Sequence, residues 1–439
     1  MQPRAIALLP LLLFLALFIG SGLYYQAQDT DFAFYQISAP VAILPAIVLA
    51  LLLERGALNS RIETFIKGVG DNTIITMCII YLLAGAFASV AKAVGGVDAT
   101  VNFGLSVVPE SLVLPGLFVI TAFVATSMGT SMGTIAAIAP VAVGLSEATD
   151  LPLTLTVGTV IGGAMFGDNL SIISDTTIAA TRSQGCEMRD KFRVNFMIAV
   201  PAALLTLVVL YLQSSGGSIV APGDYDLIKV LPYVAVLVLA ISGLNVMLVL
   251  FSGIVLAGLV GLLQVADYSL ASLSADIYAG YTSMQEILIL SLLIGGLGAL
   301  MKHQGGLEFL ARMIDRLARG SKRRSGEISI AASVVLANLC TANNTVAIIL
   351  SGSLARDIAL RHDVDPRRSA SLMDIFSCVI QGMLPYGAQV LLAGSIAALS
   401  PLELIGSIYY CWLLGLAALI AIVAGFPRLQ AITVALRQA

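Results

Sequence analysis

Long apolar segments recur from one end of the chain to the other, with short polar stretches between them. They cover residues 5–25, 36–53, 71–91, 111–147, 152–183, 191–213, 227–241, 244–264, 284–302, 328–360, 369–399 and 402–426. An α-helix needs about 20 apolar residues to cross the roughly 30 Å hydrocarbon core of a membrane. The pattern therefore predicts an all-α polytopic membrane protein, and its first segment is expected to be a transmembrane helix rather than a signal peptide.

Four of these segments are too long for one straight helix, and polar residues, glycine or proline interrupt each of them near its centre. We expect 111–147 and 328–360 to be re-entrant hairpins, which enter and leave the membrane on the same side. The segments 152–183 and 369–399 are expected to cross as broken transmembrane helices. This interpretation gives about 10 full crossings plus two hairpins.

The distribution of Lys and Arg orients the chain, because loops rich in these residues stay in the cytoplasm. With both termini cytoplasmic, only Lys92 and Lys229 of the 23 Lys and Arg residues fall near the outer side. Lys191 and Arg368 are counted among the charges of the inner loops. Lys92 and Lys302 are expected to snorkel from the ends of their helices.

Two further stretches have the spacing of amphipathic helices. In residues 307–317, Leu307, Leu310 and Ile314 fall on one helical face, and residues 58–67 show a weaker version of the same pattern. Both are predicted to be helices that lie in the membrane interface, with a solvated loop helix as the alternative.

An internal repeat relates the two halves of the chain. Residues 82–96 and 292–306 match at a constant offset of 210, with Lys92 and Lys302 in register. Each half then has a polar-tipped hairpin, a broken helix and a closing helix, and the charge distribution makes the two halves inverted. Inverted repeats with discontinuous helices are typical of secondary transporters. The predicted parts are an N-terminal transmembrane scaffold (1–70), transport repeat 1 (71–213), linking transmembrane helices (214–283), inverted transport repeat 2 (284–426) and a cytoplasmic tail (427–439).

Composition narrows the function further. Hydrophobic residues make up 58% and charged residues 11% of the chain, whereas a soluble domain has roughly 25% charged residues. A net charge of -3 gives no indication of a nucleic-acid partner, and the five cysteines lack the paired spacing of a disulfide or zinc site. Residues 129–133 fit G-x-S-x-G, but that motif marks a nucleophile only between a strand and a helix. We therefore expect a transporter and no enzyme.

Polar residues at the hairpin tips and helix breaks are the candidate ion-binding or substrate-binding residues. Freed carbonyls and hydroxyls at membrane depth suit sodium, and an ionised Asp there needs a cation, a proton or a partner. The candidates are Thr130, Ser131, Asp168, Asn169, Ser171, Ser174, Asp175, Thr176, Thr341, Asn343, Asn344, Thr345, Asp374, Pro385 and Tyr386.

Sodium is expected at Asp168, Asp175, Asn343 and Asn344. The structural alternative for Asp175 is an ion pair with Arg182, about two helical turns further along the chain. The alternative for the Asn and Thr residues of the tips is capping of the half-helices.

Residues 162–177 read GGAMFGDNLSIISDTT. This block is similar to the pattern GGAxFGDHxSPISDTT of the NhaC-type sodium/proton antiporter family, which belongs to the wider ion-transporter superfamily. Residues 129–134, 341–343 and 384–386 resemble the GTSxGT, TAN and IPW elements of that family. The resemblance covers about residues 70–400.

The resemblance implies a secondary active transporter that exchanges sodium for protons by alternating access across a bacterial inner (plasma) membrane, with sodium as the coupling ion and no cofactor. The family histidine is Asn169 here, so a group that titrates near neutral pH is missing. The alternative is a sodium-coupled transporter or exchanger of a small organic solute, an amino acid or a carboxylate. Membrane lipid, sodium, protons or such a solute are the expected partners, and a homodimer is expected by analogy.

Overall fold

The computed structural model describes residues 4–28, 36–53, 57–171, 174–214, 223–242, 244–306, 308–309, 312–313 and 323–427. Helices dominate these residues, and no strand occurs among them. Six of the described helices are long and apolar enough to cross a membrane: Ala5–Tyr25, Ile74–Ala93, Met188–Ser214, Val246–Gln264, Gln285–His303 and Pro366–Ala397. The prediction of an all-helical, multi-pass membrane protein is confirmed.

The first group of helices gathers around α15 (Gln285–His303). Its members are η1 (Ala5–Leu8), α1 (Leu9–Gln26), α2 (Ala39–Ala42), α3 (Leu44–Leu53) and α4 (Leu58–Val69). The amphipathic stretch 58–67 lies within α4, which packs against α15. The other amphipathic stretch, 307–317, lies mostly outside the described residues.

The first half of the chain continues from α5 to α11. Its elements are α5 (Asn72–Ala93), α6 (Gly96–Val107), η3 (Glu110–Leu112), α7 (Val113–Met128), α8 (Ser131–Glu147), α9 (Leu153–Leu170), α10 (Asp175–Gln184) and α11 (Met188–Ser214). The segment 111–147 thus contains α7 and α8, and the segment 152–183 contains α9 and α10. The helix α6 falls in a stretch that the apolar pattern left unassigned.

The second half begins after two linking helices and one further helix. Its elements, with the linking ones first, are α12 (Leu227–Ile241), α13 (Val246–Gln264), α14 (Leu270–Ser283), α15, α17 (Arg323–Thr341), α18 (Asn344–Arg361), α19 (Pro366–Met383), α20 (Ala388–Ala397), α21 (Pro401–Ile405) and α22 (Tyr409–Ala424). The sequence pattern did not indicate α14, because Ser, Thr and Asp dilute its apolar residues. The segment 402–426 is divided between α21 and α22 rather than forming one closing helix.

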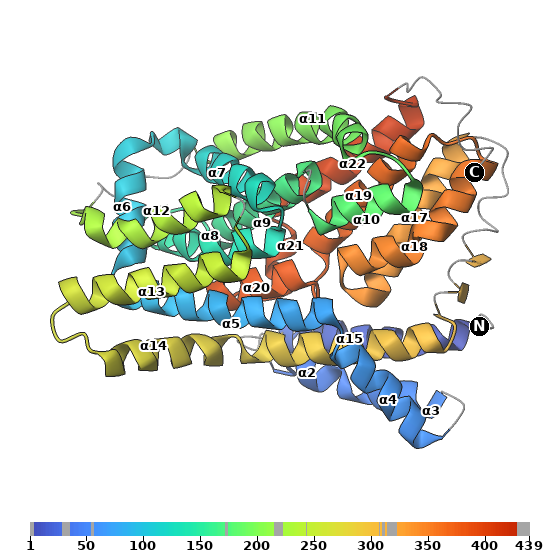
Figure 1. Cartoon of the computed structure of the whole chain (residues 1–439), viewed down its shortest axis with the longest axis horizontal. Coiled ribbons are helices and arrows are strands. Elements are labelled where there is room, and N and C mark those ends of the chain that lie inside the picture. The colour runs from blue at the N-terminus through green and yellow to red at the C-terminus, as the bar shows by residue number, and fades with distance from the viewer. Residues whose placement is uncertain are drawn as a thin grey trace.

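The second parts of the two broken segments pack against the opposite half of the molecule. The helix α10 packs against α18 and α19, whereas α20 packs against α8. Figure 1 shows α10 beside the orange α18 and α20 beside α8. The four interrupted elements therefore meet in the interior.

Glycine permits very close helix packing at two places. Gly85 of α5 faces Gly280 of α14, and Gly68 of α4 faces Gly295 of α15. A Cβ added to any of the four would collide with the opposing helix. Small residues allow such close backbone approach in membrane helix pairs. These contacts fasten α14 to α5 and α4 to α15.

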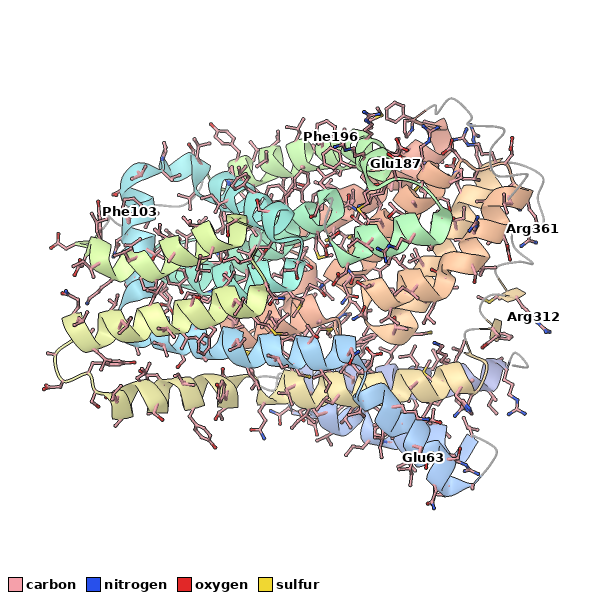
Figure 2. All side chains as sticks on the ribbon, in the orientation of Figure 1. Glu63, Phe103, Glu187, Phe196, Arg312 and Arg361 are labelled. Atoms are coloured by element: carbon pink, nitrogen blue, oxygen red, sulfur yellow. The ribbon has the colours of Figure 1, made fainter. Side chains whose placement is uncertain are left out.

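Large apolar side chains cover the outside of the helices. Phe123, Leu212 and Leu263 are 58%, 65% and 79% exposed, and Figure 2 shows Phe196 of α11 on the outer surface. An apolar surface of this extent is solvated by lipid in a membrane protein. The core, in contrast, contains buried polar and charged side chains such as Asp168 and Asp374.

Two cations that were assigned to inner loops are buried instead, which corrects that part of the charge count. The side chains of Lys191 and Arg368 are 0% exposed, and they form ion pairs with Asp374 and Glu327. Each partner lies on another helix, so inspection of the neighbouring sequence could not reveal the pairing.

Candidate functional site

Two of the helix interruptions lie at the tips that the sequence indicated. The residue after α7 is Gly129, with a φ of 69°, and the residue after α17 is Ala342, with a φ of 51°. Thr130 and Asn343 follow in extended conformation as the N-cap residues of α8 and α18. Glycine adopts a left-handed φ without steric cost, so the local sequence favours the first of these turns.

The other two interruptions divide the predicted broken helices. Residues 171–174 separate α9 from α10, and residues 384–387 separate α19 from α20. Pro385 disfavours helical conformation at Leu384, which has extended backbone angles and ends α19. At the first break, Ser174 is the N-cap of α10 and accepts a hydrogen bond from the Thr177 amide.

A cavity of about 250 Å³ lies among the four interruptions, with α5 on one side. Eight of the candidate residues line it: Thr130, Ser131, Asp168, Asp175, Thr176, Asn343, Asn344 and Thr345. The set includes the four residues at which sodium is expected.

Asp168 is the buried carboxylate of this cavity, with 5% of its surface exposed. Ser131 Oγ, at the start of α8, donates a hydrogen bond of 2.9 Å to Asp168 Oδ2. Thr176 Oγ1, in the first turn of α10, donates a weaker bond of 3.4 Å to Asp168 Oδ1. The carboxylate therefore joins the first hairpin to both sides of the first break.

Two glutamines continue this connection into the second half. Gln389 Nε2 of α20 donates to Ser131 Oγ at 3.0 Å, and Gln381 Nε2 of α19 donates to Gln389 Oε1 at 2.7 Å. Gln381 Nε2 also donates to the carbonyl of Ala342, at the second tip, over 3.1 Å. One hydrogen-bonded path thus links all four interruptions around the cavity.

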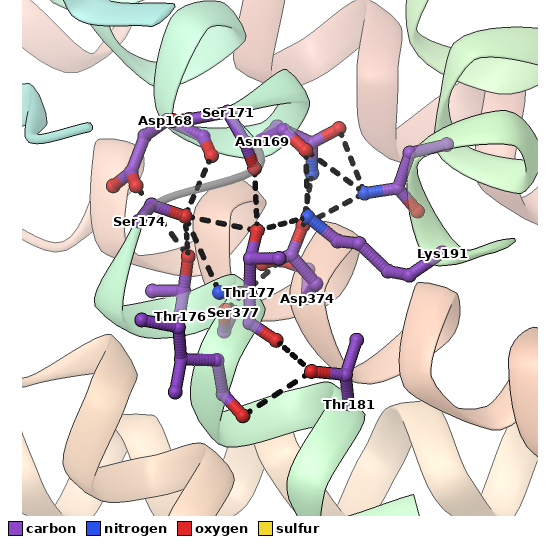
Figure 3. Close-up of polar contacts among 12 residues, drawn as sticks. Asp168, Asn169, Ser171, Ser174, Thr176, Thr177, Thr181, Lys191, Asp374 and Ser377 are labelled. Carbon is purple, nitrogen blue, oxygen red and sulfur yellow. Dashed lines mark hydrogen bonds and ion pairs between the residues drawn. The ribbon is translucent and has the colours of Figure 1, made fainter. Parts of the chain in front are cut away.

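An ion pair closes the first break from the side away from the cavity. Lys191 Nζ of α11 lies 2.7 Å from Asp374 Oδ2 of α19, and it donates to Thr177 Oγ1 at 2.6 Å and to the Asn169 carbonyl at 2.8 Å. Asn169 Nδ2 and Asn195 Nδ2 donate to the same Asp374 oxygen, at 3.1 and 2.7 Å. Figure 3 shows the Lys191 ammonium between the break and Asp374.

Asp175 differs from Asp168 because its side chain is exposed. It is the first residue of α10 and lines the cavity. An ion pair with Arg182 does not occur among the contacts of the described residues. This leaves the Asp175 carboxylate available to the cavity.

The second tip shows that capping also takes place. Asn343 Oδ1 accepts a hydrogen bond of 2.9 Å from the Val346 amide, which is the capping contact expected as the alternative to ion binding. Asn344 Oδ1 accepts from the Thr345 amide at 3.0 Å. Asn343 and Asn344 both line the cavity, so the residues that make these local hydrogen bonds also border the candidate site.

The remaining candidates support the breaks from outside the cavity. Ser171 Oγ donates to the Thr126 carbonyl at 3.0 Å, and Tyr386 Oη donates to the Leu339 carbonyl at 2.7 Å. Thr341 Oγ1 donates to the Ala337 carbonyl within α17. The candidates that do not line the cavity are Asn169, Ser171, Ser174, Thr341, Asp374, Pro385 and Tyr386.

Sequence reasoning missed four residues of this region: Lys191, Asn195, Gln381 and Gln389. The two glutamines interrupt apolar helices, so their polarity at membrane depth was a usable signal. Lys191 and Asn195 belong to one face of α11, but the position of Lys191 near the start of that helix resembled an ordinary loop charge. Their contacts with Asp374, which lies on another helix, are what connect them to this region.

The arrangement suits a cation that prefers oxygen ligands. Among the described residues that line the cavity, the only charged ones are the two aspartates, and none is Lys, Arg or His. No group of three or more His, Cys, Asp and Glu side chains with metal-binding geometry occurs in the described part of the chain. Hydroxyl, amide and carboxylate oxygens are hard donors, which suit ions such as sodium.

Comparison with known proteins finds similarity to antiporters of sodium and of small solutes. The profile of the Na+/H+ antiporter family matches residues 4–214. The Na(+)/H(+) antiporter NhaC of Bacillus subtilis is 24% identical, covering 82% of this chain and 84% of the relative. The malate-2H(+)/Na(+)-lactate antiporter of the same species is 23% identical, covering 79% and 80%. The arginine/ornithine antiporter ArcD of Halobacterium salinarum is 22% identical, covering 80% of each chain.

A crystal structure of the YdaH transporter of Alcanivorax borkumensis is also similar to this chain. It is 13% identical, with a TM-score of 0.44 over 95% of this chain and 99% of that one. The profile match in the first half of the chain and the relatives that align over most of their length support a membrane-embedded secondary transporter. The chain is thus similar to the Na+/H+ antiporter family and to NhaC-type proteins.

Proposed function

We propose that the protein exchanges sodium for protons by alternating access, and that both ions use the central cavity. The observation that carries this proposal is the placement of Asp168. Its carboxylate is nearly buried, lines the cavity, and has Ser131 and Thr176 as its hydrogen-bond donors. A buried carboxylate without a basic partner of its own requires a cation or a proton. Competition between sodium and a proton for this group is the basis of antiport.

The proposed ion site consists of Asp168 and Asp175 with oxygens of Asn343 and Asn344. The two asparagines come from the second tip and the two aspartates from the first break. An ion held between them would contact elements of both halves, so a relative movement of the halves would change its coordination. This property is required if one ion is to couple binding to a conformational change.

Inverted repeats are part of the proposal, and an offset of 213 residues supports them. It relates the starts of three helix pairs: α8 and α18, α9 and α19, α10 and α20. It also relates the left-handed residues Gly129 and Ala342, and Gly185 and Ala398. At the cavity, the same offset pairs Asp168 with Gln381.

Contacts between α5 and α15 give independent support. Tyr81 Oη lies 3.2 Å from Ser291 Oγ, and Cys78 Sγ approaches the Leu288 carbonyl, so that both contacts join residues 210 positions apart. Equivalent residues meet in this way close to a two-fold axis. We infer two inverted transport repeats at 71–213 and 284–426, each with a re-entrant hairpin and a broken helix.

The remaining parts of the organisation belong to the same proposal. Residues 1–70 are proposed as an N-terminal scaffold, residues 214–283 as linking transmembrane helices and residues 427–439 as a cytoplasmic tail, with both termini facing the cytoplasm in a bacterial inner membrane. The backbone amide of Arg4 bonds the Gly305 carbonyl just beyond α15, so the start of the described chain lies at the Lys302 end of the molecule. Lys and Arg are abundant in the loop that follows, which supports a cytoplasmic location. A homodimer is retained as an expectation from analogy.

Transport of a small organic solute is the second candidate, and the size of the cavity favours it. A volume of about 250 Å³ exceeds the roughly 30 Å³ of one water molecule several-fold. The relatives named for malate and lactate or for arginine and ornithine carry such solutes. A carboxylate cargo would find no basic side chain among the described lining residues, so an amine is the better fit.

Purified protein in proteoliposomes tests the proposal. A sodium gradient should drive a change of internal pH, detected with a trapped pH-sensitive dye, and Asp168→Asn should abolish it because the site loses its buried negative charge. Asp71→Asn, outside the central cavity, is the matched control. Sodium-independent pH traces for the wild-type protein would contradict sodium/proton antiport, and sodium-dependent uptake of a labelled amine would select the second candidate.

A further inference from the structure

Lys191 is one of the largest fully buried side chains of the described structure, and the proposed transport cycle gives it no role. It extends from the first turn of α11 to the gap between α9 and α10. Burial of an ammonium group costs several kcal/mol unless it is paired and hydrogen-bonded. A lysine in this position therefore needs a structural or functional reason.

All three donors of the Lys191 ammonium have acceptors. They are Asp374 Oδ2, the Asn169 carbonyl at the end of α9, and Thr177 Oγ1 in α10. Thr177 Oγ1 in turn donates to the Ser171 carbonyl at 2.7 Å. The Asn169 carbonyl at the break thus meets a cation supplied by the protein, and the Ser171 carbonyl is connected to that cation through Thr177.

The Lys191 ammonium changes the net charge around the cavity. Three carboxylates surround the first break: Asp168, Asp175 and Asp374. Lys191 neutralises Asp374, whose Oδ2 also receives the amides of Asn169 and Asn195. Asn169 directly follows Asp168 in the chain and bonds both Lys191 and Asp374, so one residue connects the ion pair to the cavity carboxylate.

We propose that Lys191 is a resident cation of the transport site, which neutralises Asp374 so that only Asp168 and Asp175 remain to bind the transported cation. Lys191 then sets the charge of the site and the affinity of the site for the transported cation, without contacting that cation. The inference rests on the proposed function only in taking a cation as the cargo.

This charge role predicts opposite effects for the two members of the pair. Asp374→Asn leaves an unpaired ammonium near Asp168, which should weaken sodium binding about tenfold or more, as expected for a unit charge inside a protein. Lys191→Met leaves an unpaired carboxylate, which should strengthen cation binding by a similar factor in sodium titrations at alkaline pH, where this carboxylate is ionised. The double variant Lys191→Met/Asp374→Asn should return toward wild-type affinity. A purely structural pair predicts instead that both single variants weaken binding.

A measurement without sodium tests the resident charge separately. In sodium-free buffer, the unfolding temperature of Lys191→Met should fall as the pH rises from about 6 to about 9. The reason is that the folded state then holds a proton on the unpaired Asp374, which the unfolded state releases. The wild-type protein pairs Asp374 with Lys191, and Asp374→Asn and the double variant lack the carboxyl group. None of these three proteins should show the same slope. The other charged groups at the break, Asp168 and Asp175, are common to all four proteins.

The buried pair of Arg368 and Glu327 provides a matched control. Its ion pair is equally buried, but Glu327 is 14 residues before the end of α17, about 20 Å along the helix from the second tip. Arg368→Met should reduce the unfolding temperature without strengthening sodium binding.

The outcomes separate the two proposals. Opposite sodium shifts together with the pH-dependent slope of Lys191→Met support the resident cation. Parallel losses of sodium affinity in both single variants, or a Lys191→Met slope equal to that of the wild-type protein, overturn it. A wild-type protein that does not bind sodium contradicts the proposed antiport. The pH dependence of the unfolding temperature in sodium-free buffer still decides the role of Lys191.

Discussion

Ser131 shows how one hydroxyl can serve two functions at the residue scale. It is 2% exposed, donates to Asp168 and accepts from Gln389. The hydroxyl therefore orients the cavity carboxylate and connects it to the second half of the chain. Its neighbour in the same tip, Ser127, only donates to the Phe123 carbonyl of its own helix.

Replacing these two serines separates the roles. Ser131→Ala should lower the free energy of unfolding by about 1–3 kcal/mol, because it leaves buried polar partners unsatisfied, and it should also weaken sodium binding. Ser127→Ala should change the free energy of unfolding by no more than about 0.5 kcal/mol, which is the usual effect of a substitution that breaks no buried polar contact. Thermal unfolding in detergent with and without sodium measures both quantities. Equal effects of the two changes would argue against a role of Ser131 at the ion site.

At the scale of elements, the two tips use the same backbone shape with different residues. Gly129 directly follows α7 and Ala342 directly follows α17, and both have a left-handed φ, of 69° and 51°. An L-residue with a Cβ pays roughly 1–2 kcal/mol in that region. The second tip therefore carries strain that the first tip avoids.

Exchanging the residues should have opposite effects on stability. Gly129→Ala should destabilise the protein by about 1 kcal/mol. Ala342→Gly should stabilise it by up to about 1 kcal/mol, partly offset by the greater freedom of glycine in the unfolded chain. Unfolding temperatures of the two variants and the wild-type protein provide the comparison. A lower unfolding temperature for Ala342→Gly would show that the strain at the second tip is not limiting.

For the molecule as a whole, two further cavities lie at the far ends of α5 and α15. Gly85, Ala88 and Lys92 line one of about 220 Å³, and Gly295, Gly298 and Lys302 line the other of about 310 Å³. The larger one also includes Thr341 and Asn343 of the second tip, and Asn343 lines the central cavity as well. The tip thus separates the central cavity from the Lys302 end by a single residue layer.

Cysteine labelling tests the predicted orientation of these two ends. In a Cys186→Ser background, Gly298→Cys should react with a membrane-impermeant maleimide only from the cytoplasmic side. Ala88→Cys, its equivalent at the offset of 210, should react only from the outer side. The other four native cysteines are buried and should react slowly. Labelling of both positions from one side would contradict the inverted arrangement.

The sequence alone determined the class of the protein, the positions of its four helix interruptions and eight of the residues that line the cavity. Apolar length and local polarity are properties of consecutive residues, so Gly129, Asp168, Asn343 and Pro385 could be recognised in place. The pairing of Lys191 with Asp374 and the path through Gln381 and Gln389 depended on the tertiary structure. Their partners lie on other helices, far away in the chain, and a buried charge differs from a loop charge only through its surroundings.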